Sequence, residues 1–60
     1  MKIETGQIWK LTREYLFMTL TKKEKIEHKY FNSELWEVLE LKSSVRLELW
    51  IDPESDEFIQ

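Results

Sequence analysis

The sequence predicts an all-β protein, a small barrel of about five short antiparallel strands with one short helix as an optional addition. The first observation is the run 45–51, where apolar Val45, Leu47, Leu49 and Ile51 alternate with Arg46, Glu48 and Trp50. A period of two places these two sets on opposite faces of a strand, whereas a helix would scatter them. The second is that four or five such candidate strands recur about every ten residues. The third is proline at position 53, which ends the strongest run.

The size of the chain restricts both its core and its sites. Sixty residues form a single domain, residues 1–60, without cysteine and with one histidine. A chain of this length buries only about 60% of its extended surface, so packing must supply its stability, with self-association as a further aid. The lack of cysteine excludes disulfides and cysteine-based zinc sites and fits a reducing, cytoplasmic location. The N-terminus lacks a signal-peptide core, and the longest apolar run, residues 15–18, is too short to span a membrane.

The N-terminal half predicts a hairpin. Gly6 marks a turn or a close backbone approach, and residues 7–12 form the first strand candidate. Arg13-Glu14 makes a tight connection without the usual Asn-Gly signature. Residues 15–21 form a second strand whose two faces are both rather apolar. This strand is therefore expected to be covered on each side or to contact a partner.

Residues 22–34 admit two interpretations. Thr21-Lys22-Lys23-Glu24 matches a capping box that would start a helix, and Ile26 and Tyr30 would then lie one turn apart. The favoured alternative is a charged loop or frayed strand anchored by Ile26 alone.

The C-terminal half predicts a second hairpin and a closing strand. Residues 35–41 contain good helix formers, but a strand is favoured because residues 45–51 follow after a three-residue link. The alternation in 35–41 is imperfect, and a bulge near Glu40 would reconcile its registers. Residues 52–55 are expected to form a turn, and 56–60 a closing edge strand.

The order of these pieces resembles the SH3-like barrel. The resemblance is carried by Gly6-Gln7-Ile8-Trp9-Lys10 at the start, Trp36-Glu37-Val38-Leu39 in the middle and Phe58-Ile59 at the end. The pattern is similar to small SH3-like proteins of phages and bacteria that open with a Gly-x-Ile-Trp type strand. A phage or mobile-element origin is what this resemblance implies, whereas a shared fold does not fix a function.

No motif predicts catalysis, a metal or a cofactor. Asp52, Glu54 and Asp56 alternate as in a calcium loop, but that motif's glycine is missing and the chain ends before its closing glutamate, which favours a solvated acidic turn. His28 has no nucleophile context. Glu34, Glu37 and Glu40 recur every third residue, which is typical of a solubilising face. The prediction is therefore a protein that is not an enzyme.

Basic residues interleaved with aromatic ones suggest an alternative function in nucleic-acid binding. Charge would meet phosphates and rings would stack on bases. The net charge of −3 opposes this reading, because such domains are usually basic. Residues 1–30 hold seven Lys or Arg against four Glu, and residues 31–60 hold two against eight Asp or Glu. The candidate nucleic-acid residues are Lys10, Arg13, Lys22, Lys23, Lys25 and Lys29.

The leading prediction is a non-enzymatic module that docks another protein through an aromatic patch with a charged rim, as an inhibitor or adaptor. The three tryptophans suggest it, because a small core seldom buries three and exposed aromatics often anchor interfaces. A sub-hypothesis has the acidic half, from Glu34 to Glu57, engage a basic surface or mimic a phosphate backbone. A homodimer formed through exposed strand edges is a third option. The candidate partner-binding residues are Trp9, Tyr15, Phe17, Trp36 and Trp50.

Overall fold

The computed structural model describes residues 2–25 and 32–60, and every regular element in these ranges is a β-strand. The sheet has five antiparallel strands, which confirms the predicted fold class. No stretch of the described residues forms a helix long and apolar enough to cross a membrane. The strands are β1 (Ile8–Leu11), β2 (Leu16–Lys23), β3 (Glu34–Glu40), β4 (Arg46–Ile51) and β5 (Glu57–Phe58).

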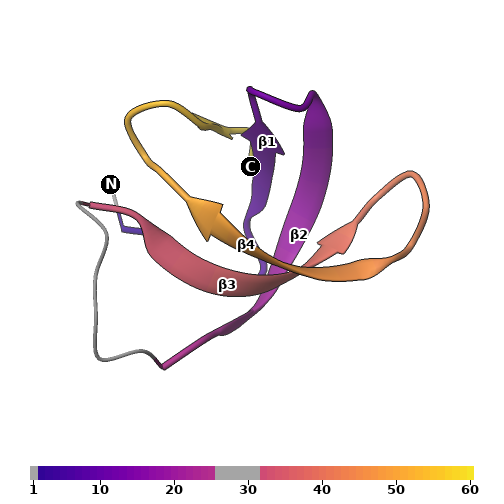
Figure 1. Cartoon of the computed structure of the whole chain (residues 1–60), viewed down its shortest axis with the longest axis horizontal. Coiled ribbons are helices and arrows are strands. Elements are labelled where there is room, and N and C mark those ends of the chain that lie inside the picture. Colours follow the sequence, from indigo (N-terminus) through magenta and orange to yellow (C-terminus); the bar gives the residue numbers. More distant parts are fainter. Residues whose placement is uncertain (1, 26–31) are drawn as a thin grey trace.

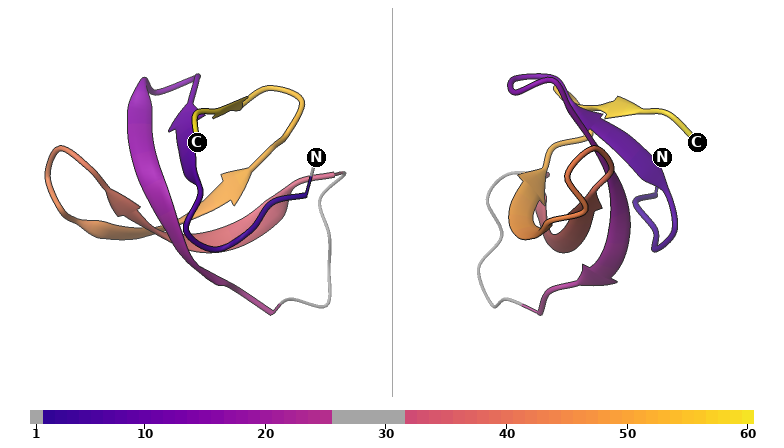
Figure 2. Two further views of the ribbon diagram at one scale, coloured as in Figure 1. Left: turned by 180° about the vertical axis from the view of Figure 1, so that it is seen from behind. Right: turned by 90° about the vertical axis from the view of Figure 1, so that its right-hand side faces the viewer.

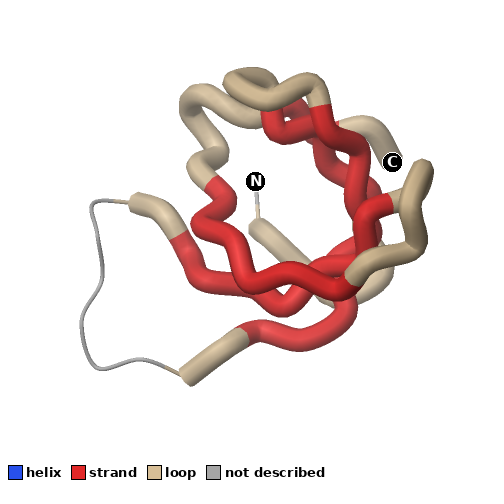
Figure 3. The backbone as a smooth tube through the Cα atoms, turned by 45° about the vertical axis from the view of Figure 1, so that its right-hand side comes forward, coloured by secondary structure: helices blue, strands red, loops and turns tan. Residues whose placement is uncertain are grey.

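The sheet has the order β4-β3-β2-β1-β5 and curls strongly without closing. The hairpin of β3 and β4 crosses the hairpin of β1 and β2, so the two form the sides of a half-open barrel (Figures 1 and 2). In the part of the chain that is described, the edge strands β4 and β5 do not pair with each other. The connection from β4 to β5 spans the gap between these two edge strands. In Figure 3 the strands and their connections surround the N-terminal segment.

The core lies on the concave face of the sheet. Trp9 from β1, Met18 and Leu20 from β2, and Val38 from β3 are each at most 2% exposed. The predicted alternation is confirmed from Arg46 to Ile51, because Ile51 is buried while the side chains of Arg46, Glu48 and Trp50 are exposed; Val45, predicted on the core side, is 47% exposed. The other buried apolar residues are Ile3, Leu11 and Trp36, and Leu16, Leu47 and Leu49 pack against the cluster from its margin.

The bulge lies on a different strand from the one predicted. The pairing of β2 with β3 shifts by one residue between Leu20 and Lys22, which makes Thr21 the extra residue. Its hydroxyl donates to the carbonyl oxygen of Glu37 at 2.8 Å. The bulge predicted near Glu40 is wrong, because β3 pairs with β4 from Glu34 to Leu39 without any shift. Trp36, Val38 and Glu40 all point inward, so the alternation of β3 is regular.

The described start of this segment agrees with the favoured loop or frayed strand, and the alternative of a helix starting at Thr21 is wrong there. Strand β2 continues to Lys23, and the main-chain N–H of Glu24 still donates to the carbonyl of Leu35 at 3.0 Å. Pairing with β3 therefore prevails over the local capping signal. The centre of this segment, which carries Ile26, His28 and Tyr30, lies outside the described residues.

Two predicted turns are present with the backbone geometry that they need. Gly6 has φ of 91°, in the left-handed region that favours glycine, which confirms the turn there. The connection between β1 and β2 spans residues 12–15 and ends at Tyr15, with φ of 55°. The main-chain N–H of Glu14 donates to the carbonyl of Leu11 at 3.1 Å within it. This unusual conformation at Tyr15 places its side chain at the start of β2, fully on the surface.

Candidate functional site

Two of the five aromatic residues predicted to bind a partner belong to the core. Trp9 and Trp36 are each 2% exposed. The indole N–H of Trp9 donates to Oε1 of Gln7 at 3.0 Å, and that of Trp36 donates to Oε1 of Glu34 at 3.0 Å. Each acceptor stands two residues before its tryptophan, on the same face of the strand. Burial thus overturns the prediction that Trp9 and Trp36 form part of a surface patch.

The other three predicted aromatics are exposed, but they do not form one cluster. Tyr15 is 76% exposed, Phe17 42% and Trp50 41%. Tyr15 and Phe17 share the convex side of the β1–β2 hairpin, whereas Trp50 lies at the far end of β4. The aromatic surface therefore divides into two places, which have different chemical linings.

The first place is an apolar surface formed by Tyr15, Phe17 and Leu41, which we call the outer apolar patch. Leu41 is 45% exposed, and its main-chain N–H donates to the carbonyl of Phe17 at 2.9 Å. That bond holds the end of β3 against the start of β2, so the side chains lie together over a shallow hollow of about 490 Å³. The hollow is also lined by Leu16, Glu40 and Lys42. Exposed apolar groups gathered in this way are typical of interaction sites.

Lys10 provides the charged rim of the outer apolar patch. It lies opposite Phe17 in the pairing of β1 with β2, on the face away from Trp9. Its Nζ is 5.4 Å from the ring centre of Tyr15 and 5.7 Å from that of Phe17. Cation–π contacts of this kind stabilise by about 0.5–1 kcal/mol at exposed sites. The contact therefore favours, by a small amount, the arrangement in which one cation lies beside both rings.

The turn that carries Leu41 is fixed by the carboxylate of Glu40. This carboxylate accepts hydrogen bonds from the main-chain N–H groups of Lys42 at 2.5 Å and Ser43 at 3.0 Å. The N–H of Lys42 is the main cause of a lowered pKa of Glu40, and bonding to Ser43 adds to it. Ser44 completes the turn with φ of 61°. A buried glutamate at this position thus orders the turn beside the patch.

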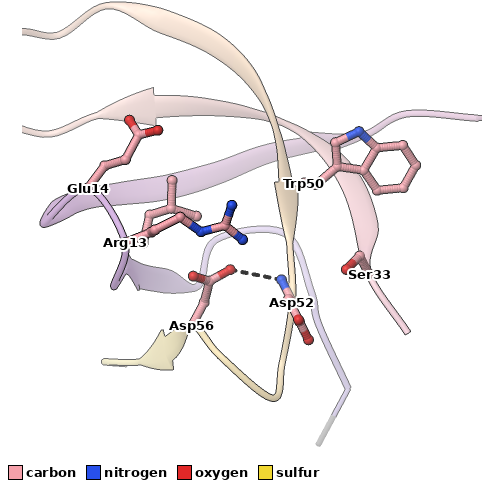
Figure 4. Close-up of a pocket in the computed structure, with 7 residues that line it drawn as sticks. Arg13, Glu14, Ser33, Trp50, Asp52 and Asp56 are labelled. Carbon is pink, nitrogen blue, oxygen red and sulfur yellow. Dashed lines mark hydrogen bonds between the residues drawn. The ribbon is translucent and has the colours of Figure 1, made fainter. Parts of the chain in front are cut away.

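The second place is a hollow on the open side of the barrel, with a volume of about 440 Å³ (Figure 4). Arg13 extends into it toward Asp52 and Asp56, whereas the ring of Trp50 lies toward the end lined by Ser33. Both oxygens of Asp56 are engaged, accepting from the main-chain N–H groups of Thr12 at 3.3 Å and Asp52 at 2.8 Å. The remaining lining residues are Leu11 and Glu14. The carboxylates here hold turns together, and the hollow is mixed in charge.

The predicted acidic turn is an ordered structure. Oδ1 of Asp52 accepts a hydrogen bond from the main-chain N–H of Glu54 at 2.9 Å. The main-chain carbonyl of Asp52 accepts one from the main-chain N–H of Asp56 at 2.8 Å. Within residues 2–25 and 32–60, no three His, Cys, Asp or Glu side chains are grouped so as to hold a metal ion.

The basic residues predicted to bind nucleic acid do not come together. Lys10 lies opposite Phe17, and Lys22 is five residues further along β2, about 17 Å at about 3.3 Å per residue. The Nζ of Lys23 lies 3.6 Å from Oε2 of Glu34. Arg13 lines the open-side hollow and Lys25 is exposed, whereas Lys29 lies outside the described residues. The described cations thus occupy opposite ends of the β1–β2 hairpin.

The acidic half of the sequence is also dispersed by the fold. Carboxylates of Glu34, Glu37, Glu40, Asp52 and Asp56 all accept hydrogen bonds within the chain. Glu37 also lies 3.7 Å from Arg46. These carboxylates therefore also serve to hold the fold together.

Comparison with known proteins identifies no relative of this chain: no family model, no curated protein and no solved structure matches it. The function is therefore inferred from the geometry of the surface alone.

Leu41 is the patch residue that the sequence did not reveal. It follows β3 and precedes a polar link, so its spacing suggested only one further member of an imperfect alternation. Its contact with Phe17 depends on the register between β2 and β3, which runs without a shift from the pair of Met18 with Glu40 to that of Leu20 with Val38. The signal available in the sequence was the apolar outer side of residues 15–21, which needed cover.

Proposed function

We propose that this protein is a non-enzymatic interaction module that binds another protein through the outer apolar patch. The observation that carries the proposal is the juxtaposition of Tyr15, Phe17 and Leu41 over one shallow, mainly apolar hollow. All three side chains are more than 40% exposed, although the core buries other aromatics completely. Aromatic side chains that are rigid and partly exposed are typical anchors of protein interfaces.

The charges around the outer apolar patch specify the chemistry of its partner. Lys10 lies over the rings and Lys42 lines the hollow, while the carboxylate of Glu40 faces its own turn. The rim is therefore cationic although the chain as a whole carries −3. The complementary surface would offer an apolar side chain flanked by Asp or Glu.

An SH3-like barrel and a phage-encoded inhibitor or adaptor form the more specific version of this proposal. Five short antiparallel strands in one strongly curled sheet support the first part. The compact size and the exposed patch support the second, in which a small protein blocks or bridges a larger one.

The experiment is affinity capture from a lysate of the source organism with matched surface variants. A triple variant, Tyr15→Ser, Phe17→Ser and Leu41→Ser, removes the patch, and Ile59→Ser removes a comparable exposed apolar side chain elsewhere. The proposal predicts proteins that wild type and Ile59→Ser retain and the triple variant loses. An identical set of bound proteins for all three, with each variant folded by circular dichroism, would contradict it.

Nucleic-acid binding is a second candidate at the same surface, because Lys10 lies over two exposed rings. In proteins that bind single-stranded nucleic acid, basic side chains contact the phosphates and aromatic side chains stack on the bases. Filter binding of random single-stranded DNA and RNA between about 50 and about 200 mM salt separates the two functions. Retention that falls steeply with salt and with Lys10→Gln would favour nucleic acid, and absence of retention at low salt would eliminate it.

A further inference from the structure

Strand β4 presents main-chain groups that are not used in the described sheet. Among residues 2–25 and 32–60, β4 pairs with β3 alone. The carbonyl of Val45 accepts from Glu40 N–H at 2.9 Å, so the main-chain groups of Val45, Leu47 and Leu49 face β3. Those of the alternate residues Arg46 and Glu48 then face away from it. The turn between β3 and β4 extends sideways past β2, which places this end of the edge at the periphery (Figures 1 and 2).

Pairing with β3 also leaves apolar side chains of β4 partly exposed and one of its charges without an opposite charge. On the inner face Leu47 and Leu49 are only half-buried, and the preceding Val45 is 47% exposed. On the outer face Glu48 lies directly opposite Glu37. Like charges at opposed positions destabilise a sheet. Arg46 lies 3.7 Å from Glu37, and Glu48 forms no ion pair with any described residue.

We propose that a second copy of this chain binds to β4, with the two strands antiparallel about a two-fold axis at Leu47. In this register Arg46 lies opposite the partner's Glu48, and Glu48 opposite the partner's Arg46. Each such pair faces outward from its own sheet and can exchange two main-chain hydrogen bonds. The charge that β3 leaves uncompensated at Glu48 therefore meets a guanidinium, twice by symmetry.

The apolar face supports the same register. Leu47 meets the partner's Leu47, and Val45 meets the partner's Leu49, which covers the exposed part of all these side chains. Moving the axis by one residue to Glu48 would oppose two identical carboxylates instead. The self-complementary pattern thus favours the axis at Leu47 over the axis at Glu48, and a second copy fits it without any other partner.

Sedimentation velocity over about 10 μM to about 1 mM tests the proposal. Since one strand pair is smaller than a standard interface of about 1,600 Å², we expect a weak dimer whose fraction rises with concentration. Arg46→Glu and Glu48→Arg should each be monomeric, because like charges then face each other. An equimolar mixture of the two variants should associate, because each position again meets its opposite charge. Glu14→Arg makes the same charge change as Glu48→Arg in the β1–β2 turn and should dimerise as wild type does.

Amide hydrogen exchange on the wild-type protein provides a measurement that does not depend on variants. The N–H groups of Arg46 and Glu48 should be protected at high concentration and exchange faster on dilution. A strict monomer at about 1 mM would overturn the proposal. Unchanged dimerisation of both single variants would overturn it too, and so would a mixture of the two that stays monomeric. A dimer without protection at these amides would also overturn it, because the interface would then lie elsewhere.

Discussion

The carboxylate of Asp56 accepts a hydrogen bond from the main-chain N–H of Thr12, which precedes it by 44 residues. Its other oxygen accepts from the N–H of Asp52 at 2.8 Å. One side chain thus joins the β1–β2 turn to the β4–β5 turn, just beyond the pair of Lys10 with Glu57 at which β1 and β5 meet.

Removal of this carboxylate should destabilise the fold. Asp56→Ala leaves two main-chain donors without their acceptor and should lower the free energy of unfolding by about 1–3 kcal/mol. Asp56→Asn retains one carbonyl acceptor and should cost less. Urea unfolding followed by tryptophan fluorescence measures both. Equal stability of Asp56→Ala and wild type would show that the hydrogen bonds to the Asp56 carboxylate contribute nothing to stability.

The turn next to the outer apolar patch should make stability depend on pH. Donors from Lys42 and Ser43 hold the pKa of Glu40 below its ordinary value of 4.5. A lowered folded-state pKa contributes stability above the unfolded-state pKa, and this contribution is lost as pH falls through the folded-state value. Glu40→Gln should therefore be less stable than wild type at neutral pH, with the difference shrinking in acid.

Unfolding free energies measured from about pH 7 to about pH 3 check this dependence. The exposed Glu14→Gln in the β1–β2 turn is the matched control and should follow the wild-type profile. A constant difference between Glu40→Gln and wild type at every pH would rule out the carboxylate as its source.

The hydrogen bond from the buried indole of Trp36 to Glu34 should contribute to the stability of the fold. Glu34→Ala leaves the N–H of Trp36 unpaired inside the protein, which should cost about 1–3 kcal/mol. Glu34→Gln retains the acceptor oxygen and loses only the ion pair with Lys23, a surface contact of about 0–1 kcal/mol. Thermal unfolding should rank wild type, Gln and Ala in decreasing stability. If Gln and Ala were equally destabilising, the ion pair and not the indole bond would account for the loss.

The sequence predicted the strands well because alternation in a half-buried strand is a local signal. Residues 45–51 show it clearly, and β4 forms there. The signal failed where pairing between distant residues decides the structure. Thr21 carries a good helix cap, yet its hydroxyl bonds to Glu37 of the neighbouring strand.

The candidate site was predicted in part for the same reason. Tyr15 and Phe17 are neighbours on one strand, so their shared face could be inferred. The joining of Leu41 to them depends on the pairing of β2 with β3, two segments distant in the sequence, which no local pattern shows. Burial of Trp9 depends on Phe58, whose ring meets it edge-on with centres 5.7 Å apart, although the two residues lie at opposite ends of the chain.

Photocrosslinking tests the proposed docking surface most directly. A photoreactive phenylalanine analogue replaces Phe17 in the outer apolar patch or, as a matched control, Phe58, which is 36% exposed beside Trp9. Both variants are irradiated in lysate of the source organism. The proposal predicts a defined protein adduct from position 17, suppressed by excess wild type, and none from position 58. Equal adducts from both positions, or an adduct at position 58 alone, would contradict docking through the patch.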